Sequence, residues 1–353
     1  MSKQHRPRLN EDEWTLIKSI REQCAAHGIG LNHVPDGWLK SKESSLRFKN
    51  PAYKPQEQLE REIDFTGVFD SLTPLSLSEG KKRAKGIFDR LVYTDVHVGM
   101  EVNPKGRALY GGKWDAEELG KRLEEMVKFT IDNRQSKILH IDDLGDFMDG
   151  WNGQTVRKGH DLPQNMDNQK AYDEGVKFKV QLVNALVPYF DKIYCRNICV
   201  DNHSGDFGYV VNSAFAMVAK LMHPKKVFVY NQLKFIEHYQ VGGYGFMTTH
   251  GKDDVNLKFG FKPHLNPDGV KKIENYMNHH GLFEGVVWEF SKGDSHQCLF
   301  DECSSTRFKY YNYPAFSPAS NWVQTNFTPQ RMGFFLFNYY EERGKASHEY
   351  YFQ

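Results

Sequence analysis

Five short apolar segments of this chain are each followed by side chains that can bind a metal ion. They lie at residues 88–94, 137–142, 193–200, 245–249 and 285–290, and they alternate with helical patterns at 115–133, 168–189, 209–222 and 268–280. Alternating strands and helices predict an α/β domain. Ligands in open α/β sheets gather at the carboxyl ends of the strands, so we expect the side chains after these five segments to meet.

The most acidic of the strand ends lies within residues 138–150, Ile-Leu-His-Ile-Asp-Asp-Leu-Gly-Asp-Phe-Met-Asp-Gly. The apolar run at 138–141 predicts a buried parallel strand. Four aspartates then follow within eight residues. Carboxylates this close repel one another unless protons, hydrogen bonds or a cation compensate, which makes the cluster a candidate site for hard divalent metals. A solvated acidic turn is the alternative, because such turns are common after strands.

The other strand ends offer both oxygen and nitrogen ligands. Asp95 and His97 share one side of an extended segment, because alternate residues face the same way. Asn202 offers an amide oxygen, and His250 and His296 offer imidazoles. A mixed shell without thiolates suits Mn²⁺, Fe or Zn²⁺ rather than a structural zinc site.

The order of these motifs resembles that of the calcineurin-like metallophosphoesterases, over roughly residues 88–300. The matching motifs are Asp95-x-His97, Asp143 with Asp146, Asn202-His203, His250-Gly251 and Gly293-x-x-His296. The resemblance implies an α+β fold in which a β-sandwich is flanked by helices and holds two metals at one edge. It also implies a hydrolase that uses two divalent cations to cleave phosphate esters, with Mn²⁺ as our first choice and Mg²⁺, Fe or Zn²⁺ as the others.

The resemblance also assigns roles to individual residues. Two sets of three side chains match the ligands of the two metals: Asp95, His97 and His296 for one, and Asn202, His250 and Asp294 for the other. An aspartate of the central cluster would bridge the metals. His203 matches the histidine that contacts the phosphate and helps the leaving group depart.

The central block can be aligned with the Gly-Asp-x-x-Asp of the family in two ways. Either Asp143 and Asp146 fill the two positions, or Asp146 and Asp149 fill them after Gly145. We favour Asp143 as the bridging ligand, because it lies just past the apolar run, where a strand-end ligand is expected. Asp146 is then an auxiliary carboxylate that holds a neighbour in place.

Two further positions depart from the family pattern. Asp201 stands where the family usually has Gly, and Asp294 stands where it has His. A carboxylate at 294 makes the site more anionic and favours Mn²⁺ or Mg²⁺. If Asp294 turned away, the second metal would be held weakly. A catalytically impaired binding or scaffold protein on the same fold therefore stays open as an alternative.

The first 55 residues are predicted to form a small, weakly basic helical appendage. Asn10 can cap a helix over 11–26, and residues 38–48 suit a second short helix. The appendage carries ten Lys and Arg against six Asp and Glu. It can be a nucleic-acid-binding module of helix-turn-helix type, a docking arm or a partner-binding helical hairpin. Residues 56–86 are predicted to be a linker, and 87–353 the metallophosphoesterase domain.

The modest positive excess and the resemblance to the DNA-repair nuclease branch of the family favour a DNA nuclease. The alternative enzyme is a phosphodiesterase or phosphatase acting on a small or cyclic nucleotide or on a phosphoprotein. Arg157 and His160, in the long loop after the central cluster, are candidate phosphate contacts. A protein partner or a homodimer is also possible. At the C-terminus, residues 331–340 and 348–352 predict a closing β-hairpin.

The cysteines and the hydropathy pattern bear on the compartment. The five cysteines have no paired zinc-ribbon spacing, so reduced thiols are the default expectation. No apolar run approaches the roughly 20 residues that span a bilayer, and Met1–Arg8 lacks the apolar core of a signal peptide. We therefore expect a soluble, cytoplasmic protein without a membrane partner.

Overall fold

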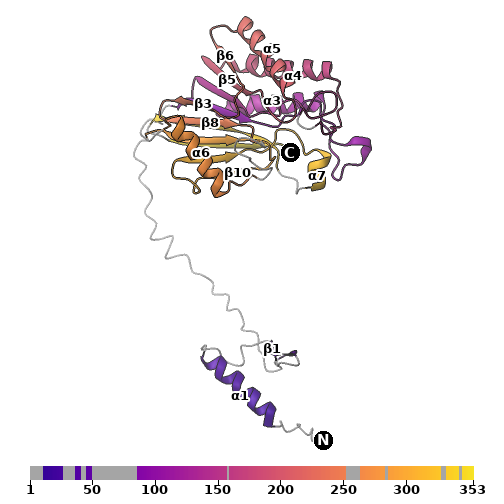
Figure 1. The fold of residues 1–353 in the computed structure, drawn as a ribbon, viewed down its shortest axis with the longest axis vertical. Coiled ribbons are helices and arrows are strands. Elements are labelled where there is room, and N and C mark those ends of the chain that lie inside the picture. The colour runs from indigo at the N-terminus through magenta and orange to yellow at the C-terminus, as the bar shows by residue number, and fades with distance from the viewer. Residues whose placement is uncertain are drawn as a thin grey trace, which may run out of the picture. The chain divides into compact units, whose positions relative to one another are not determined.

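The computed structural model describes residues 11–26, 36–40, 45–49, 86–156, 159–251, 263–282, 285–326, 331–341 and 344–353 (Figure 1). The chain divides into two compact units, residues 1–78 and 79–353. No described helix is both long enough and apolar enough to cross a membrane.

The described part of the N-terminal unit is one helix and one hairpin. Helix α1, Glu11–Ala26, lies where it was predicted. Strands β1, Asp36–Lys40, and β2, Ser45–Lys49, pair antiparallel, so the prediction of a second helix over 38–48 is wrong. An isolated helix of this length is marginal, whereas pairing two strands across a short connection satisfies the backbone groups of both. The helix-turn-helix module is excluded with it.

Two mixed sheets form the C-terminal unit. The six-stranded sheet has the order β13-β12-β3-β4-β5-β6 and the five-stranded sheet the order β10-β11-β9-β8-β7. The strands of the first are β3 (Gly86–Tyr93), β4 (Ile138–Asp143), β5 (Lys192–Ile198), β6 (Val227–Gln232), β12 (Gly333–Tyr340) and β13 (Lys345–Tyr351). Those of the second are β7 (Glu237–Val241), β8 (Tyr244–Thr249), β9 (Val287–Lys292), β10 (Leu299–Asp301) and β11 (Phe308–Asn312).

The first sheet combines predicted parallel strands with the predicted C-terminal hairpin. Strands β3, β4, β5 and β6 are parallel to one another. Strands β12 and β13 pair antiparallel, and β12 continues the sheet by pairing antiparallel with β3. The hairpin is thus confirmed. Strands β10 and β11 were not predicted, and β10 has only three residues, too few to show a period.

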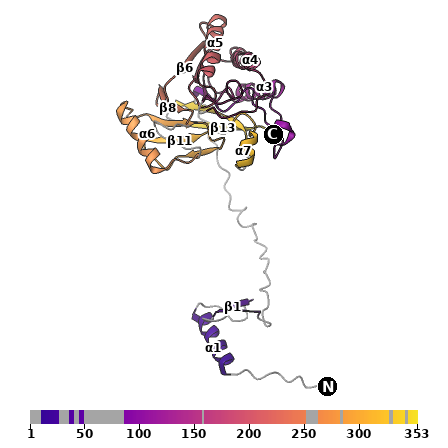
Figure 2. The ribbon, with the colours of Figure 1, turned by 45° about the vertical axis from the view of Figure 1, so that its right-hand side comes forward.

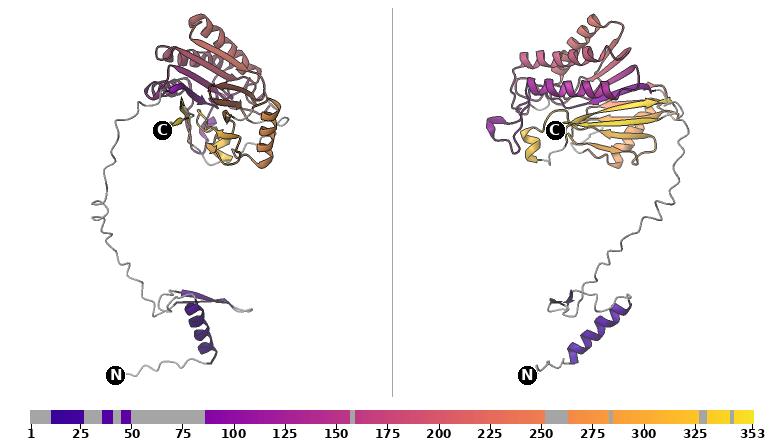
Figure 3. Two further views of the ribbon diagram at one scale, coloured as in Figure 1. Left: turned by 90° about the vertical axis from the view of Figure 1, so that its left-hand side faces the viewer. Right: turned by 180° about the vertical axis from the view of Figure 1, so that it is seen from behind.

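Helices cover the outer face of each sheet, as Figures 2 and 3 show. They are α3 (Ala116–Asn133), α4 (Asn168–Leu186) and α5 (Asp206–Met222) on the six-stranded sheet, and α6 (Pro267–His279) on the five-stranded sheet. A short turn of 3-10 helix, η2 (Pro104–Gly106), and the short helix α7 (Asn321–Asn326) lie in the connections.

Alternate residues of the central strands fill different layers of the core. On β3, Phe88 and Val92 face the second sheet, whereas Leu91 and Tyr93 face the helices. This is the period-two alternation of a strand, and both faces are buried, with Asp89 and Arg90 as the two charged residues of the strand. The layer between the sheets is largely aromatic, with Phe88 stacked on Tyr339 at 4.5 Å between ring centroids. The C-terminal unit is therefore an α+β structure with two mixed sheets.

Candidate metal centre

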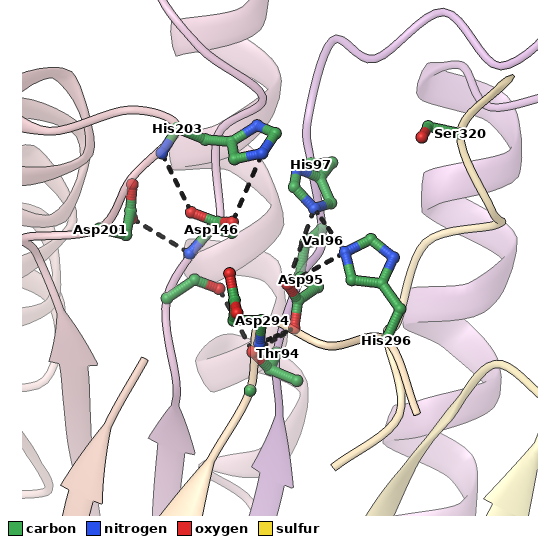
Figure 4. A network of polar contacts seen from close by, with 12 residues as sticks. Thr94, Asp95, Val96, His97, Asp146, Asp201, His203, Asp294, His296 and Ser320 are labelled. Carbon is green, nitrogen blue, oxygen red and sulfur yellow. Dashed lines mark hydrogen bonds and ion pairs between the residues drawn. The ribbon is translucent and has the colours of Figure 1, made fainter. Parts of the chain in front are cut away.

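The carboxyl ends of five strands, taken from both sheets, bring one group of polar side chains together (Figure 4). Asp95 and His97 follow β3, and Asp146 and Asp149 follow β4. The other members of the group follow β5, β8 and β9: Asn202 and His203, His250, and Asp294 and His296. The predicted convergence of strand ends is thus seen, and it depends on both sheets ending at the same edge.

Asp95, His97 and His296 form one part of the centre. The Nε2 atom of His296 lies 3.2 Å from Asp95 Oδ1 and 3.2 Å from His97 Nε2. His97 Nε2 is 3.7 Å from the same carboxylate oxygen. These three donor atoms lie within 4.8 Å of one another, a spacing at which one ion can be bound by all three. The structure therefore groups the three residues that the family resemblance assigns to one metal.

Asp146, His250 and Asp294 form the other part. His250 Nε2 lies 3.0 Å from Asp146 Oδ2 and 3.8 Å from Asp294 Oδ1. Asp95, Asp146 and His250 also place donor atoms within 4.8 Å of one another, so the two parts adjoin. Asp294 has not turned away, because its side chain is buried and its backbone N–H donates to Asp95 Oδ2 at 3.1 Å.

Asp149 connects two histidines of the centre, although it was not among the predicted site residues. Its Oδ1 atom lies 3.3 Å from His97 Nδ1 and 3.6 Å from His203 Nδ1. The Nδ1 of His203 is also 2.8 Å from the Asp149 carbonyl oxygen. A carboxylate in this place fixes the orientation of both rings. The spacing Gly145-Asp146-x-x-Asp149 was the signal that pointed to it.

Asp143 lies outside the centre, so our preference for it as the bridging ligand is corrected. Its carboxylate accepts hydrogen bonds from the buried Lys179 of α4 and from the backbone N–H of Gly145. The chain turns at Gly145, which has φ +97° and where a Cβ atom would come within 3.0 Å of His250. This turn carries Asp146 to the middle of the site. The alignment of Asp146 and Asp149 after Gly145 is the one that fits the geometry.

Asp201, at the position where the family has Gly, holds the backbone of Asp146 in place. Its Oδ2 accepts the backbone N–H of Asp146 at 3.1 Å, and its Oδ1 accepts the N–H of Ser204 at 2.7 Å. Burial and the negative charge of Asp146 raise the pKa of Asp201 to about 6. The substitution therefore ties the end of β4 to the loop after β5.

Contacts between aspartate and histidine side chains of opposite charge set the pKa values of the groups at the candidate metal centre. Burial by itself would raise the pKa of Asp95, but the charge and hydrogen bonds of His296 and His97 lower it well below its usual range. Burial likewise opposes the charge on His97, yet hydrogen bonds to Asp149 and Asp95 raise its pKa to about 10. The pKa of His250 is raised mainly by Asp146, again against burial. The carboxylates of Asp95 and Asp146, whose pKa values are both lowered, thus stay ionised and available to cations, whereas burial raises the pKa of Asp294.

Left-handed backbone conformations are concentrated at the centre. Seven described non-glycine residues have positive φ, and only Lys105 and Asn152 of these lie elsewhere. The five at the centre are Asp95 (φ 53°), His97 (φ 49°), Asp146 (φ 46°), Asp294 (φ 68°) and His296 (φ 53°). Such conformations cost roughly 1–3 kcal/mol each and cluster at functional sites.

Two buried oxygen atoms bear on whether the residues of the candidate metal centre fit a bound cation. Within the described part of the chain, Asn202 Oδ1 and Asp294 Oδ2 are buried and accept no hydrogen bond. A buried acceptor left unsatisfied costs roughly 1–3 kcal/mol, whereas a bound divalent cation would satisfy both. Together with the carboxylates and imidazoles beside them, they form an oxygen and nitrogen donor set without thiolates. The donor set fits two hard or borderline cations.

A cleft of about 560 Å³ opens over the centre. Its floor includes His97, Asp146 and His203, and its outer wall includes His160 and Trp322. His160 thus lines the cleft beside the site, and its role as a phosphate contact stays a prediction, whereas Arg157 falls outside the described residues. Trp322, on α7, is 56 % exposed and gives the wall an aromatic surface.

Comparison with known proteins adds no assignment: no family model matches this sequence, and no curated protein matches it.

Proposed function

We propose that this protein is a metal-dependent phosphoesterase of the calcineurin-like metallophosphoesterase type, with two divalent cations held between its two sheets. The observation that carries the proposal is the meeting of carboxylate, amide and imidazole groups from five strand ends, on backbone that is held in left-handed conformations. An ordinary acidic turn explains neither the strained backbone nor the buried oxygen acceptors.

The geometry favours a ligand set for each cation. One cation would be held by Asp95, His97 and His296, and the other by Asn202, His250 and Asp294, with Asp146 between them. Such a pair of cations supplies charge for clamping a phosphate and for lowering the pKa of a water molecule. Mn²⁺ is the cation we propose first, because Asp294 adds a carboxylate where an imidazole would favour softer metals.

His203 is the residue proposed to act on the leaving group. Its ring lies in the cleft, with Nε2 3.7 Å from Asp146 and Nδ1 held by the Asp149 carbonyl oxygen. The negative charges of Asp146 and Asp149 raise its pKa against the effect of burial, which leaves a proton on the ring to donate. We therefore propose that His203 protonates the departing oxygen of the ester.

The test is hydrolysis of bis-p-nitrophenyl phosphate with added Mn²⁺. The native protein is expected to release p-nitrophenol, and His203→Gln to lower kcat by about 10²–10⁴-fold. His279→Gln, on the exposed end of α6, is the matched control and is expected to keep full activity. A native protein that binds Mn²⁺ but hydrolyses no phosphate ester would favour the scaffold alternative.

We further propose a nucleic acid strand, DNA first, as the substrate. What supports this is the exposed ring of Trp322 on the wall of the cleft, a surface on which a nucleobase can stack. Digestion of labelled single- and double-stranded DNA should be compared with hydrolysis of cyclic nucleotides. Trp322→Ala is expected to slow DNA digestion about tenfold or more and to leave bis-p-nitrophenyl phosphate hydrolysis unchanged. Activity on cyclic nucleotides alone would indicate the small-nucleotide enzyme.

A further inference from the structure

One face of α5 is exposed and mostly apolar. Val210, Met217 and Leu221 project from it with 50 %, 68 % and 81 % of their surface exposed, and Tyr209 beside them is 43 % exposed. Their spacing of seven and four residues places them on one side of the helix, with Ser213 between them. Folded single-chain proteins rarely expose contiguous apolar surface of this kind without a partner. Figure 2 shows α5 on the outer side of the six-stranded sheet.

The charges of this face lie only at its two ends. Asp206 begins the helix and Lys220 is in its last turn, and both are exposed. Neither forms an ion pair with another residue of the described chain. An acid at the N-terminus and a base at the C-terminus suit the helix dipole. The dipole does not account for the apolar residues between them.

An apolar groove adjoins the first turn of the same helix. It has a volume of about 820 Å³, and its walls include Trp151, Tyr172, Phe207 and Val210. Trp151 and Phe207 are in edge contact, with ring centroids 4.8 Å apart. Gly205, next to the turn that carries His203, also lines the groove. The most exposed apolar side chain of the helix, Leu221, lies at its opposite end.

The apolar face of α5, the charges at its two ends and the adjoining groove complement the same features on a second copy of the chain. If two α5 helices pack antiparallel about a two-fold axis at Ser213, each Asp206 lies opposite Lys220 of the second copy. At 1.5 Å per residue, both charges are about 10 Å from the axis, on opposite sides of it. The same pairing places Leu221 of the second copy opposite Gly205, one of the residues that line the groove. Ser213, a small residue, then stands at the point of closest approach.

We infer that this protein forms a symmetric dimer through α5, in which Leu221 of each copy enters the groove beside Trp151 and Phe207 of the other. Such an interface is isologous, since both copies use the same surface and the assembly is complete with two copies. The inference does not depend on the proposed phosphoesterase activity, because none of its contacts involves the candidate metal ligands.

Sedimentation velocity of the full chain at micromolar concentrations tests the dimer. The native protein is expected to sediment as a dimer, and Leu221→Glu to weaken association on the order of 30-fold or more. Met222→Glu is the matched control, because Met222 is exposed on another side of the helix. It is expected to dimerise normally. A native protein that stays monomeric, or a dimer that survives Leu221→Glu, overturns the inference.

A charge exchange tests the antiparallel pairing. Asp206→Lys and Lys220→Asp each place two like-charged pairs across the interface, so each is expected to weaken dimerisation about tenfold. The double variant restores opposite charges and is expected to regain native association. Circular dichroism checks that each variant folds. A double variant that is no better than the single ones contradicts this arrangement.

A cross-linking experiment identifies which chain segment covers the exposed face of α5. Ser213→Cys, made with Cys24, Cys298 and Cys303 replaced by Ser, is expected to form a disulfide-linked dimer on mild oxidation because residue 213 lies on the axis. Met222→Cys in the same background is expected not to do so. If an amine- or thiol-directed cross-linker instead joins residue 213 to residues 1–78 of the same chain, the N-terminal unit covers this face and the dimer is excluded.

Discussion

Two aspartates only three residues apart, Asp143 and Asp146, have unlike partners. Asp143 is paired with the ammonium group of Lys179, and both side chains are almost fully buried. Asp146 faces His250 and His203 at the candidate metal centre. The first contact neutralises a charge inside the protein, whereas the second keeps a charge available to a ligand. Their variants should therefore fail in different ways.

Replacing Asp143 by Ala should destabilise the fold. It leaves the ammonium group of Lys179 buried without an anion, and Asn197 Oδ1 as its remaining partner at 2.9 Å. We expect the free energy of unfolding in urea to fall by about 3–5 kcal/mol. The double variant Asp143→Leu/Lys179→Met should recover most of this loss, because two apolar side chains then replace the pair. Equal stability of Asp143→Ala and the native protein would contradict this account.

Replacing Asp149 by Asn should instead weaken metal binding. The neutral amide keeps the shape of the side chain but no longer holds His97 and His203 by charge. We expect the affinity for Mn²⁺ measured by calorimetry to fall about 10–100-fold. Asp191→Asn, exposed at the opposite end of β5, is the control and should bind Mn²⁺ normally. An unchanged affinity in Asp149→Asn would show that Asp149 does not position the ligands.

At the scale of elements, the loop after β9 is held by a strand that carries no ligand. Asn312 on β11 is buried, and its Nδ2 donates to Ser295 Oγ at 2.6 Å and to the carbonyl oxygen of Gln297. Its Oδ1 accepts from Lys292 Nζ at 3.0 Å. These contacts fix the short segment that contains Asp294 and His296, both of which have left-handed backbone.

Replacing Asn312 by Ala should therefore act at the metal centre from a distance. The loop after β9 loses two hydrogen bonds, Lys292 at the end of β9 loses a third, and the left-handed residues of the loop can relax. We expect Mn²⁺ affinity to fall about tenfold, in the range found for partners of metal ligands. Asn278→Ala, on the exposed side of α6, removes an asparagine that accepts from Arg307 and contacts no residue of this loop, and it should have no such effect. Metal binding by Asn312→Ala as tight as that of the native protein would contradict the argument.

At the scale of the whole molecule, a buried polar network joins the two sheets. Arg90 of β3 lies 2.6 Å from Asp142 of β4 and 3.5 Å from Glu289 of β9. Tyr239 of β7 donates to Asp142 at 2.7 Å. His140 lies beside this network, stacked between aromatic rings including that of Tyr239. Groups of this kind make the stability of the whole unit depend on pH.

His140 gives a specific pH prediction. Burial, and then the positive charge of Arg196, lower its pKa from 6.5 to about 3. The folded protein thus keeps His140 neutral, whereas the unfolded chain binds a proton there below about pH 6.5. The free energy of unfolding therefore falls as the pH drops from about 6.5 towards about 3, by about 1.4 kcal/mol per pH unit.

The measurement is the free energy of unfolding in urea at pH 7 and pH 5. A His140→Phe variant lacks the proton uptake on unfolding, so between these two values it should lose about 2 kcal/mol less than the native protein. For each protein the free energy of unfolding at pH 5 is subtracted from that at pH 7. Any packing energy that the His140→Phe variant loses equally at both pH values therefore cancels. Parallel stability curves for the two proteins would contradict a buried neutral His140.

The amino-acid sequence alone is enough to predict the alternation of strands and helices in most of the C-terminal unit and the residue types at the strand ends. Periodicity is a local property, and five apolar runs followed by Asp, Asn or His can be found without coordinates. Short elements could not be found in this way: β10 and β11 show too little pattern, and β1 and β2 pair antiparallel although the composition of residues 38–48 also suits a helix.

Which aspartate lies at the middle of the site, and which groups surround it, depends on contacts between segments that are far apart in the sequence. Asp143 and Asp146 are chemically identical in the sequence, and the buried Lys179 and the turn at Gly145 separate them. The positioning contacts of Asp149 and Asn312 likewise join groups that are distant along the chain. Local patterns fix what a segment can form, but which groups it meets is fixed by packing across the whole unit.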